Sequence, residues 1–557
     1  MKKIFTLLLA ASPILASAQW TSNPEVNTDV VAPLHCVYEW NYGINADGSI
    51  STIFTAPQNG RIELWHNLHD KDGKCVYADG AQLIASEPTM TWTAFGEIAF
   101  HDSKGNMIAV YQSMRNATEA GLIGDYLNYD VYKISPTGEM LWDEPLDLSR
   151  GEWCDYLQCA MSICELEDGS YMMAYCDYAL TESGQHGTIY MERVSADGKL
   201  LWDEPICLED KAVSYAYPYL VSAGDNQAIL LYVKGSNQDL VVRKVDFDGE
   251  AVWEKDVTVY RGGFPSVPVW TILSVIPDGE GGIIVGWRDD RYFTDFEKTH
   301  VSHILSDGSY GFASGVEGER VAYNEEWRSF EPTMLYDKEN KYLYTLHRET
   351  SASQAYQRLM LQKMADTGEL LWGPYCAELQ PGDSGCALAY FDLEFAEDGN
   401  VVAFYMVQHD GVDVAGFAHK FNAETGEPMW EEDIRLTPNV GSRSEMQVSQ
   451  LIDNQYWVAM WLDERVLETD DTSVDWTEMP ARLYMQRLNI DGTLGETVSI
   501  DMVTGEELRV RVCGRDIVAP EGAEVYRLDG TKVGTNDLEA GVYIVKCGRN
   551  ATKVIVK

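Results

Sequence analysis

The sequence has little positive charge. Its 557 residues include 42 Lys and Arg against 88 Asp and Glu, which leaves a formal net charge of −46. A field of that sign repels nucleic acid and anionic membranes, so we exclude nucleic acid as a partner. The excess of acid favours a solvated acidic surface that opposes aggregation over a surface that recruits cations or basic partners.

Long hydrophobic runs are also lacking after the first 18 residues. No later segment approaches the roughly 18 consecutive apolar residues of a spanning helix, so we predict no transmembrane segment. At the start, two lysines precede the apolar run 4–15, and small residues follow at 16–18. This pattern predicts a signal peptide over residues 1–18, cleaved between Ala18 and Gln19, and therefore an exported protein.

Paired cysteines and histidines with the spacing of a metal site are absent as well. The chain has 11 cysteines, but the clustered Cys154, Cys159, Cys164 and Cys176 contain no CxxC pair. Export favours disulfides, yet the odd count and irregular spacing fix no pairing in the body of the chain. His66/His69 and His300/His303 are three residues apart in predicted strands and so point to opposite faces. We predict no metal site and no cofactor from these residues.

What the sequence does contain is a repeated phrase. SADGKLLWDEP at 195–205 returns as SPTGEMLWDEP at 135–145, and related phrases end at residues 256, 375 and 433. An Asp-Gly or Thr-Gly turn signal recurs about every 60 residues, beginning at Asp72, Thr137, Asp197, Asp248, Asp307, Thr367, Thr425 and Asp491. Short apolar runs and Gly turns at a fixed period, without helical patterning, are typical of a β-propeller.

Each repeat is predicted to contain the same series of strands. A strand and a turn precede a strongly apolar strand ending in an aromatic, such as QAILLY or YWVAMW, which is typical of burial on both faces. A loop, an alternating strand and the Gly turn follow, and the turn predicts a hairpin. We expect the last strand of the unit to open with Leu-Leu-Trp or its variant.

A tryptophan lies at one offset after five of the turns. This position predicts an indole in the same corner of each sheet, filling the wedge between neighbouring blades, whereas a ring of sugar-stacking tryptophans would require exposed rings. The residues predicted to build this joint are Gly138, Trp142, Gly198, Trp202, Gly249, Trp253, Gly368, Trp372, Gly426 and Trp430.

The number of blades is harder to predict from the sequence than the repeat itself, because the repeat units are unequal. The first and eighth units have no tryptophan after the turn, and the fifth has Tyr310 and Phe312 instead. About 50 residues of the mature chain precede Asp72, which is enough for three strands, so we favour eight blades. Seven blades, with the N-terminal part completing the last sheet, remain the alternative. We place this all-β propeller at residues 19–502.

The pattern changes after residue 502. Residues 503–557 read as five or six short alternating strands with Gly turns, which predict a small β-sandwich. Three pieces in order, VYRLDG at 525–530, LEAGVYIV at 538–545 and the valine strand KVIVK at 553–557, resemble the C-terminal sorting domain of type IX secretion system cargo. Within them, Gly530, Gly541, Tyr543 and Lys557 carry the resemblance.

The resemblance implies a route of export for the protein and no catalytic activity of the tail itself. It implies passage through the periplasm and then across the outer membrane by the type IX machinery, which reads the folded tail. In that family the tail is commonly cleaved, and the body is released or attached to surface lipopolysaccharide. Cys513 and Cys547 lie in the first and penultimate tail strands, where a disulfide between them is one of two open alternatives.

The body is similar to a repeat family of exported proteins with no assigned activity. Its pattern, an apolar strand followed by Trp-x-Asp-x-Arg, is best kept in WRDDR at 287–291 and WLDER at 461–465. The weak candidates for a catalytic site come from these motifs, namely Arg288, Asp289, Asp290, Arg291, Asp463, Glu464 and Arg465. For an Asp-x-Arg pair, a local salt bridge with backbone hydrogen bonds is the favoured interpretation.

Two further enzyme or ligand interpretations are weak. A sialidase needs three arginines converging on a carboxylate, which Arg288, Arg291, Arg348 and Arg465 could supply, but nothing fixes its other groups. The acidic loop 468–475 offers oxygen ligands for calcium but lacks the spacing of a calcium loop, so a solvated loop is favoured. We therefore predict a secreted or surface-attached binding protein for a glycan or a protein, with a secreted glycoside hydrolase or sialidase-like enzyme as the alternative.

Overall fold

The computed structural model describes much of the chain from residue 20 to residue 556. The positions left out within that span are 33, 35–36, 38, 59–60, 87–98, 114–127, 149–160, 182–183, 213–217, 236, 238, 263–273, 291–295, 331, 354, 381–386, 410–412, 466–480, 496–510, 514, 520–521, 528–530, 537 and 548–549. The chain divides into two compact units, Met1–Glu496 and Thr497–Lys557. No helix in the described residues is long and apolar enough to cross a membrane.

The first unit is built from antiparallel sheets whose strands pair in chain order. The first sheet comprises Trp40–Ile44 (β2), Ile50–Gln58 (β3), Arg61–His69 (β4) and Gln82–Ala85 (β5). The second comprises Ala99–His101 (β6), Met107–Ser113 (β7), Asn128–Ile134 (β8) and Leu146–Asp147 (β9). The third comprises Met161–Glu165 (β10), Tyr171–Thr181 (β11), Gly184–Val194 (β12) and Ile206–Ala212 (β13).

The next sheets follow the same plan. The fourth sheet comprises Tyr219–Gly224 (β14), Gln227–Lys234 (β15), Asp239–Val245 (β16) and Val257–Tyr260 (β17). The fifth comprises Ser274–Pro277 (β18), Ile283–Asp289 (β19), Lys298–Ile304 (β20) and Glu319–Arg320 (β21), with the short 3-10 helix Gly315–Glu317 (η2) before β21. The sixth comprises Trp327–Ser329 (β22), Thr333–Asp337 (β23), Tyr342–Ser351 (β24), Gln357–Ala365 (β25) and Ala377–Gln380 (β26). Both β22 and β23 pair with β24.

The last two sheets of the unit include one strand from the start of the chain. The seventh sheet comprises Ala387–Phe395 (β27), Val401–His409 (β28), Asp413–Phe421 (β29) and Ile434–Arg435 (β30). The last comprises Arg443–Val448 (β31), Tyr456–Asp463 (β32), Arg482–Asn489 (β33) and Thr28–Asp29 (β1). In the final sheet, Thr28 lies opposite Met485 of β33. A strand from the N-terminus therefore completes the sheet formed by the last repeat.

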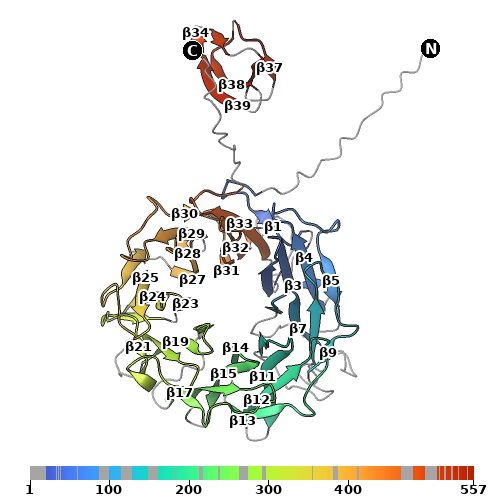
Figure 1. The fold of residues 1–557 in the computed structure, drawn as a ribbon, viewed down its shortest axis with the longest axis vertical. Helices are drawn as coiled ribbons and strands as arrows, with labels where there is room; N and C mark the ends of the chain where they lie inside the picture. The colour runs from blue at the N-terminus through green and yellow to red at the C-terminus, as the bar shows by residue number, and fades with distance from the viewer. Residues whose placement is uncertain are drawn as a thin grey trace, which may run out of the picture. The chain divides into compact units, whose positions relative to one another are not determined.

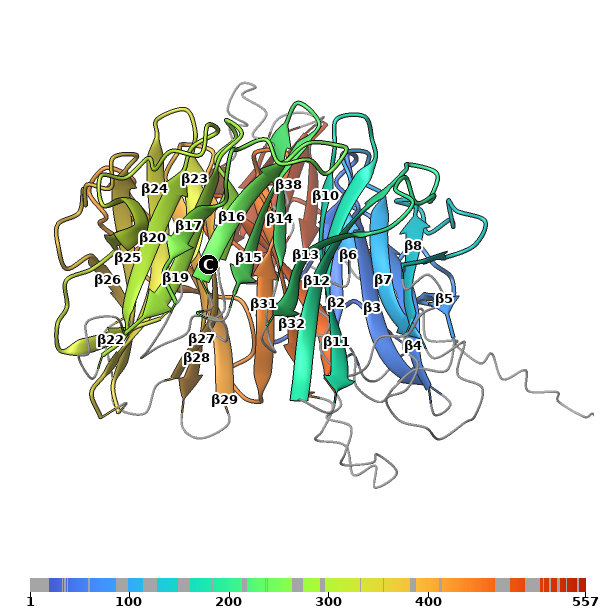
Figure 2. The same cartoon turned by 90° about the horizontal axis from the view of Figure 1, so that it is seen from below.

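These sheets form a β-propeller-like ring. Figure 1 shows them following one another in chain order around the first unit, with β14, β23, β27 and β31 on the inner side and β5, β9, β13 and β30 on the outer side. First strands of successive sheets contact one another, as β10 does β14 and β27 does β31. In the side view the sheets stand next to one another (Figure 2). The inner strands are therefore where different repeats meet.

The strongly apolar runs form the second strand of each sheet, as the sequence predicts. All eight residues of β32 are buried, and β15 and β28 supply further core residues between neighbouring sheets. Because these strands pack against a sheet on either side, apolar residues occupy both of their faces. The apolar strand in each repeat is therefore the main source of burial in the ring.

One element differs from the prediction. The segment Leu-Leu-Trp does not open the fourth strand: after the turn, Leu200 makes a single bridge with Val194, and β13 begins only at Ile206. The same single bridge precedes β17, where Ala251 pairs with Val245. The tryptophan at this point leaves the sheet to cover a turn of the next repeat, which interrupts the pairing.

The second unit is all β. It comprises Arg511–Cys513 (β34) paired with Asp516–Val518 (β35), and a sheet of Glu524–Arg527 (β36), Lys532–Val533 (β37), Gly541–Cys547 (β38) and Asn550–Val556 (β39). Its core includes Val525, Tyr543 and Val545. Tyr543 is 3% exposed and donates a hydrogen bond to the Glu539 carbonyl at 2.8 Å. Gly541 begins β38, whereas Gly530 and Lys557 lie outside the described residues.

Candidate functional site

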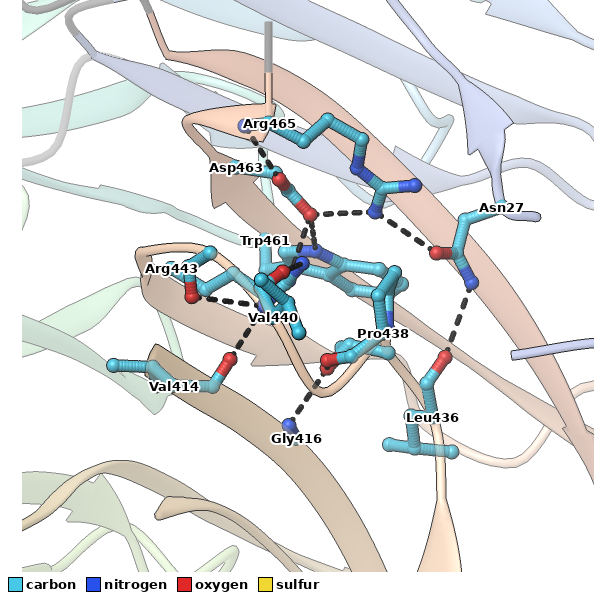
Figure 3. A network of polar contacts seen from close by, with 12 residues as sticks. Asn27, Val414, Gly416, Leu436, Pro438, Val440, Arg443, Trp461, Asp463 and Arg465 are labelled. Atoms are coloured by element: carbon cyan, nitrogen blue, oxygen red, sulfur yellow. Dashed lines mark hydrogen bonds and ion pairs between the residues drawn. The ribbon is translucent and has the colours of Figure 1, made fainter. Parts of the chain in front are cut away.

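The WLDER motif forms a buried ion-pair network. Asp463 Oδ2 accepts hydrogen bonds from Arg443 Nε at 2.8 Å and from the Trp461 indole at 3.1 Å, and it pairs with Arg465 (Figure 3). Its other oxygen accepts the Arg465 backbone N–H at 2.9 Å. Burial opposes ionisation of Asp463, but its bonds to Arg465 and Arg443 outweigh burial and lower its pKa. The Asp463 carboxylate is therefore ionised, and both of its oxygens accept hydrogen bonds from groups of the protein itself.

This network ties the ends of the ring together. Arg465 Nη2 also donates to Asn27 Oδ1 at 2.9 Å, and the Asn27 amide donates to the Leu436 carbonyl at 3.0 Å (Figure 3). Asn27 immediately precedes β1, whereas Leu436 immediately follows β30. The local salt bridge favoured from sequence is present here, and it links three segments of chain. Glu464 takes part through its backbone, donating to the Ser442 carbonyl at 3.1 Å.

The WRDDR motif also has structural contacts. The Trp287 indole donates to Asp289 Oδ2 at 2.7 Å, and its ring stacks on His300 with centroids 5.8 Å apart. Arg288 lies over the Phe330 ring at 4.7 Å. Asp290 is half-buried, and Arg291 lies outside the described residues. Trp287 and Asp289 thus secure the end of a buried strand.

Of the four arginines considered for a sialidase centre, Arg291 lies outside the described residues, and the other three lie over aromatic rings. Arg348 lies over the same Phe330 ring as Arg288, at 4.2 Å, while Arg465 lies over Tyr484 at 3.9 Å and pairs with Asp463. Loop 468–475, which was considered for calcium, lies outside the described residues. Within the described part of the chain, no group of three or more His, Cys, Asp or Glu residues is arranged to hold a metal ion.

The repeat tryptophans contact the turn of the following repeat. The Trp142 indole donates to the Ala196 carbonyl at 3.0 Å, and a Cβ on Gly198 would lie 2.5 Å from Trp142 Cδ2. Trp253 and Trp372 make the equivalent bonds to Ser306 and Glu424, at 3.1 Å each. Rings of the same set lie close to the turn glycines Gly249, Gly308, Gly426 and Gly492. The indole therefore needs a glycine opposite it.

Two aromatic residues that the sequence did not single out take the place of missing tryptophans. In the first unit, Tyr77 Oη donates to the Thr137 carbonyl at 3.0 Å, beside Gly138. The eighth unit has no aromatic, and Trp20 from the N-terminus packs on Gly73 instead, donating to the Lys71 carbonyl at 2.8 Å. At the sixth turn, the Glu319 side chain covers Gly368. The joint thus lies at the same place in these repeats, whereas the residue that forms it differs between them.

A second cluster, which the sequence did not indicate, lies on the inner strands. Asp392 and Glu394 alternate on β27 with Phe391, Leu393 and Phe395, whose side chains pack into the core. Both acids therefore lie on the opposite side of the strand from that core. Two neighbouring sheets contribute the remaining members. The inner cluster consists of Trp40 and Tyr42 of β2, Tyr390, Asp392 and Glu394 of β27, and Glu445 of β31.

The acids of the inner cluster are half-buried and lack the ion pairs that stabilise buried carboxylates such as Asp463. Asp392 accepts only backbone bonds, from Leu393 at 2.8 Å and from Val448 at 3.1 Å. Among the described residues no Lys, Arg or His contacts Asp392, Glu394 or Glu445 within ion-pair distance. By contrast, Asp256 is paired with both Lys234 and Arg243. The inner cluster thus brings three acids together without a cationic partner.

This arrangement raises the pKa of each acid. Burial raises the pKa of Asp392 to about 6, offset in part by the two backbone N–H groups. Burial and the charge of Asp392 raise the pKa of Glu394 to about 9. Burial also raises the pKa of Glu445, and the Trp40 indole offsets part of that rise. Strongly perturbed acids brought together from several elements are typical of functional sites.

The backbone carries strain at the same place. Tyr390 and Glu445 have φ of 48° and 55°, a region that non-glycine residues seldom occupy. Each lies at a register irregularity of an inner strand, between Ala389 and Phe391 in β27 and between Ser444 and Gln447 in β31. Bulges re-aim side chains and are common near functional sites. An alternation of acid and apolar residues in FDLEF was the only signal of this cluster in the sequence.

Comparisons with known proteins establish no family. No protein family matches the sequence, and no curated protein matches it. Solved structures similar to the chain include polysaccharide lyase Uly1, 11% identical, covering 75% of this chain and 94% of that one, with a TM-score of 0.43. An α-L-arabinanase of Penicillium chrysogenum is 12% identical over 60% and 94%, with a TM-score of 0.31. An α-L-arabinofuranosidase of Fusarium graminearum is 8% identical over 84% and 98%, with a TM-score of 0.35. We draw no functional conclusion from likeness at this level.

Proposed function

We propose that the protein is an exported β-propeller binding protein that holds its ligand at the inner cluster. The observation that carries this proposal is the meeting of three uncompensated acids and three aromatic rings from successive sheets. Elsewhere in the ring, buried carboxylates such as Asp463 and Glu349 are paired with arginine. Acids that the fold itself leaves without a partner are free to act on a ligand.

Eight blades are part of this proposal. Each sheet of the first unit in Figure 1 is taken as one blade, and the N-terminal strand β1 completes the blade that contains β31, β32 and β33. The N-terminal region then supplies both the first blade, through β2 and β3, and the closing strand. The two alternatives weighed from the sequence are thus combined in one architecture.

A glycan array is the direct test of ligand binding. The mature chain, residues 19–557, should retain at least one class of glycan, and the double variant Asp392→Asn/Glu394→Gln should lose that binding. Glu431→Gln/Glu432→Gln is the matched control, because it removes two exposed acids outside the inner cluster. Equal binding by all three proteins would place the ligand site elsewhere on the molecule.

A glycoside hydrolase is the second candidate, favoured by one observation. Asp392 and Glu394 lie two residues apart on one side of β27, and their pKa values are held apart, at about 6 and about 9. Such a pair offers a carboxylate and a protonated acid at neutral pH, which is what glycoside hydrolysis requires. Product analysis of any bound glycan tests it: Glu394→Gln should lower turnover at least about 100-fold, and a ligand released unchanged argues for binding alone.

The route of export is proposed from the sequence. The N-terminal signal peptide and the sorting resemblance of residues 503–557 support passage through the periplasm and the type IX machinery to a secreted or surface-attached state. Deleting residues 505–557 in a host that has this machinery should leave the body in the periplasm. The matched control is the variant Lys546→Gln, an exposed residue outside the three resembling pieces, in an otherwise complete tail, and normal export of the deletion would contradict the proposal.

A further inference from the structure

We infer that the ligand of the inner cluster carries an organic cation, a primary ammonium group, that contacts the acids of β27 and β31. This inference rests on the proposed function and names the chemistry by which the site would recognise its ligand. It draws on four features of the cluster, namely its charge, an unsatisfied hydrogen-bond donor, its aromatic rings and the titration of its acids.

The first feature is the uncompensated charge. Within the described residues, three acids from two neighbouring inner strands have no ion pair with Lys, Arg or His, whereas several other acids of the ring do. Glu349 pairs with Arg358, and Asp463 pairs with Arg443 and Arg465. A buried charge is stable only when it is paired or neutralised. A cation on the ligand supplies the missing partner.

The second feature is an indole N–H that is directed at one of these acids. Trp40 is 5% exposed, and its indole N–H has no hydrogen-bond partner of normal geometry among the described residues. The indole lies near enough to Glu445 to lower the pKa of that side chain in part, so it faces the inner cluster. A donor this deeply buried normally finds a partner in the protein. The acceptor nearest to normal geometry is Glu445 itself, so the indole N–H marks the cluster as a polar site lined by donors as well as acids.

The third feature is the aromatic wall. The rings of Trp40 and Tyr42 are stacked, with centroids 6.1 Å apart and planes inclined by 26°, and Tyr390 adds a third ring that is 45% exposed. Ring faces attract ammonium groups, and Tyr390 is the most exposed of the three rings. Acids beside aromatic faces favour a cation over a phosphate or carboxylate ligand, which the ionised acids of the cluster would repel.

The fourth feature gives the inference a measurable signature. The titratable groups that face one another here are Asp392 and Glu394 of β27, Glu445 of β31, and Tyr42 and Tyr390. An ammonium group favours the ionised form of each acid, so its binding should release protons. Affinity should rise with pH, because an acid with a pKa of about 6, as for Asp392, is about one-tenth ionised at pH 5.

Isothermal titration calorimetry on the mature chain tests the inference with two probe pairs. Glucosamine is compared with N-acetylglucosamine, and Nα-acetyl-lysine methylamide with its Nε-acetylated form, so that each pair differs in the ammonium group. We expect the amine of at least one pair to bind, its acetylated partner to bind at least about tenfold less tightly, and affinity to fall about tenfold from pH 8 to pH 5. The pair that responds identifies the amino sugar or the lysine side chain as the source. Titration in two buffers of different ionisation enthalpy should reveal proton release.

The variants separate the inference from the proposed function. Asp392→Asn/Glu394→Gln should abolish amine binding, and Glu431→Gln/Glu432→Gln should leave it unchanged. The acid variants also remove unpaired charge, so they are expected to fold. If acetylated and free amines bind equally, or a neutral glycan binds and only the acid variants lose it, the ammonium inference is wrong while the binding site stands. If neither amine binds and the glycan array is also negative, both proposals fall.

Discussion

At the residue scale, the inner cluster lowers the stability of the fold at neutral and alkaline pH. Glu394 has a pKa raised from 4.5 to about 9 by burial and by Asp392, so above pH 4.5 the folded protein keeps a proton that the unfolded chain releases. The stability linked to that proton is fully present below pH 4.5 and is lost as pH rises through 9. Functional sites commonly carry such a penalty.

Glu394→Gln should therefore stabilise the protein in a pH-dependent way. The glutamine resembles the protonated acid, so we expect the melting temperature to rise by roughly 2 °C at pH 8 and not at pH 4. Calorimetry at both pH values measures the difference. Glu431→Gln, an exposed acid, should change neither value by more than the error, and a gain of equal size at pH 4 would show that charge is not the cause.

The buried carboxylate of the WLDER motif should behave in the opposite way. Asp463→Asn removes the charge that pairs with Arg443 and Arg465, and leaves both guanidinium groups near an amide. We expect the free energy of unfolding to fall by about 3 kcal/mol. Guanidinium denaturation measures the loss, with the neighbouring Glu464→Gln as the control expected within about 0.5 kcal/mol of the parent. Coincident unfolding curves for the two variants would contradict the role given to Asp463.

At the scale of the element, the hairpin turn and the indole of the preceding repeat act as one unit. Gly198 and Gly399 both have φ of 76°, which penalises any side chain equally. They differ in their surroundings, because Trp142 lies over Gly198, whereas nothing lies within 4 Å of a Cβ on Gly399. The pair therefore separates backbone strain from inter-repeat packing.

Alanine at the two glycines should have unequal effects. Gly399→Ala should lower the free energy of unfolding by about 1 kcal/mol through strain alone, and Gly198→Ala by about 2 kcal/mol more, because the methyl group displaces the indole. Chemical denaturation of both variants gives the comparison. Losses of the same size would mean that the indole adapts without cost and that the joint is not tightly packed.

At the scale of the whole molecule, the repeat fold could be predicted because its signals are local. The Gly turns, the apolar second strands and the offset of Trp142 or Trp372 are each set by a few neighbouring residues. The start of β13 was predicted too early, since the sequence does not show that Trp202 leaves the sheet for the next repeat. The inner cluster could not be predicted, because Tyr42, Asp392 and Glu445 are brought together only when distant repeats become neighbours around the ring.

Ring closure depends on residues from both ends of the first unit. Trp20 is 4% exposed and makes with Lys71 and Gly73 the contacts that Trp142 makes with Ala196 and Gly198. It lies on the first-repeat turn at the place where the eighth unit has no aromatic of its own. The closing joint thus has the same chemistry as the interior joints but is made by the opposite end of the chain.

Trp20→Ala should open this closure. We expect it to lower the free energy of unfolding by about 3 kcal/mol, as for the interior variant Trp142→Ala. Because β1 pairs only with β33, hydrogen exchange should also speed up in β33 and the turn at Gly73, but not in the interior sheets. Val26→Ala, at a residue that is 57% exposed in the same segment, is the control. If exchange in β33 is as slow in Trp20→Ala as in Val26→Ala, the strand pairing and the Asn27–Arg465–Asp463 network close the ring without the indole.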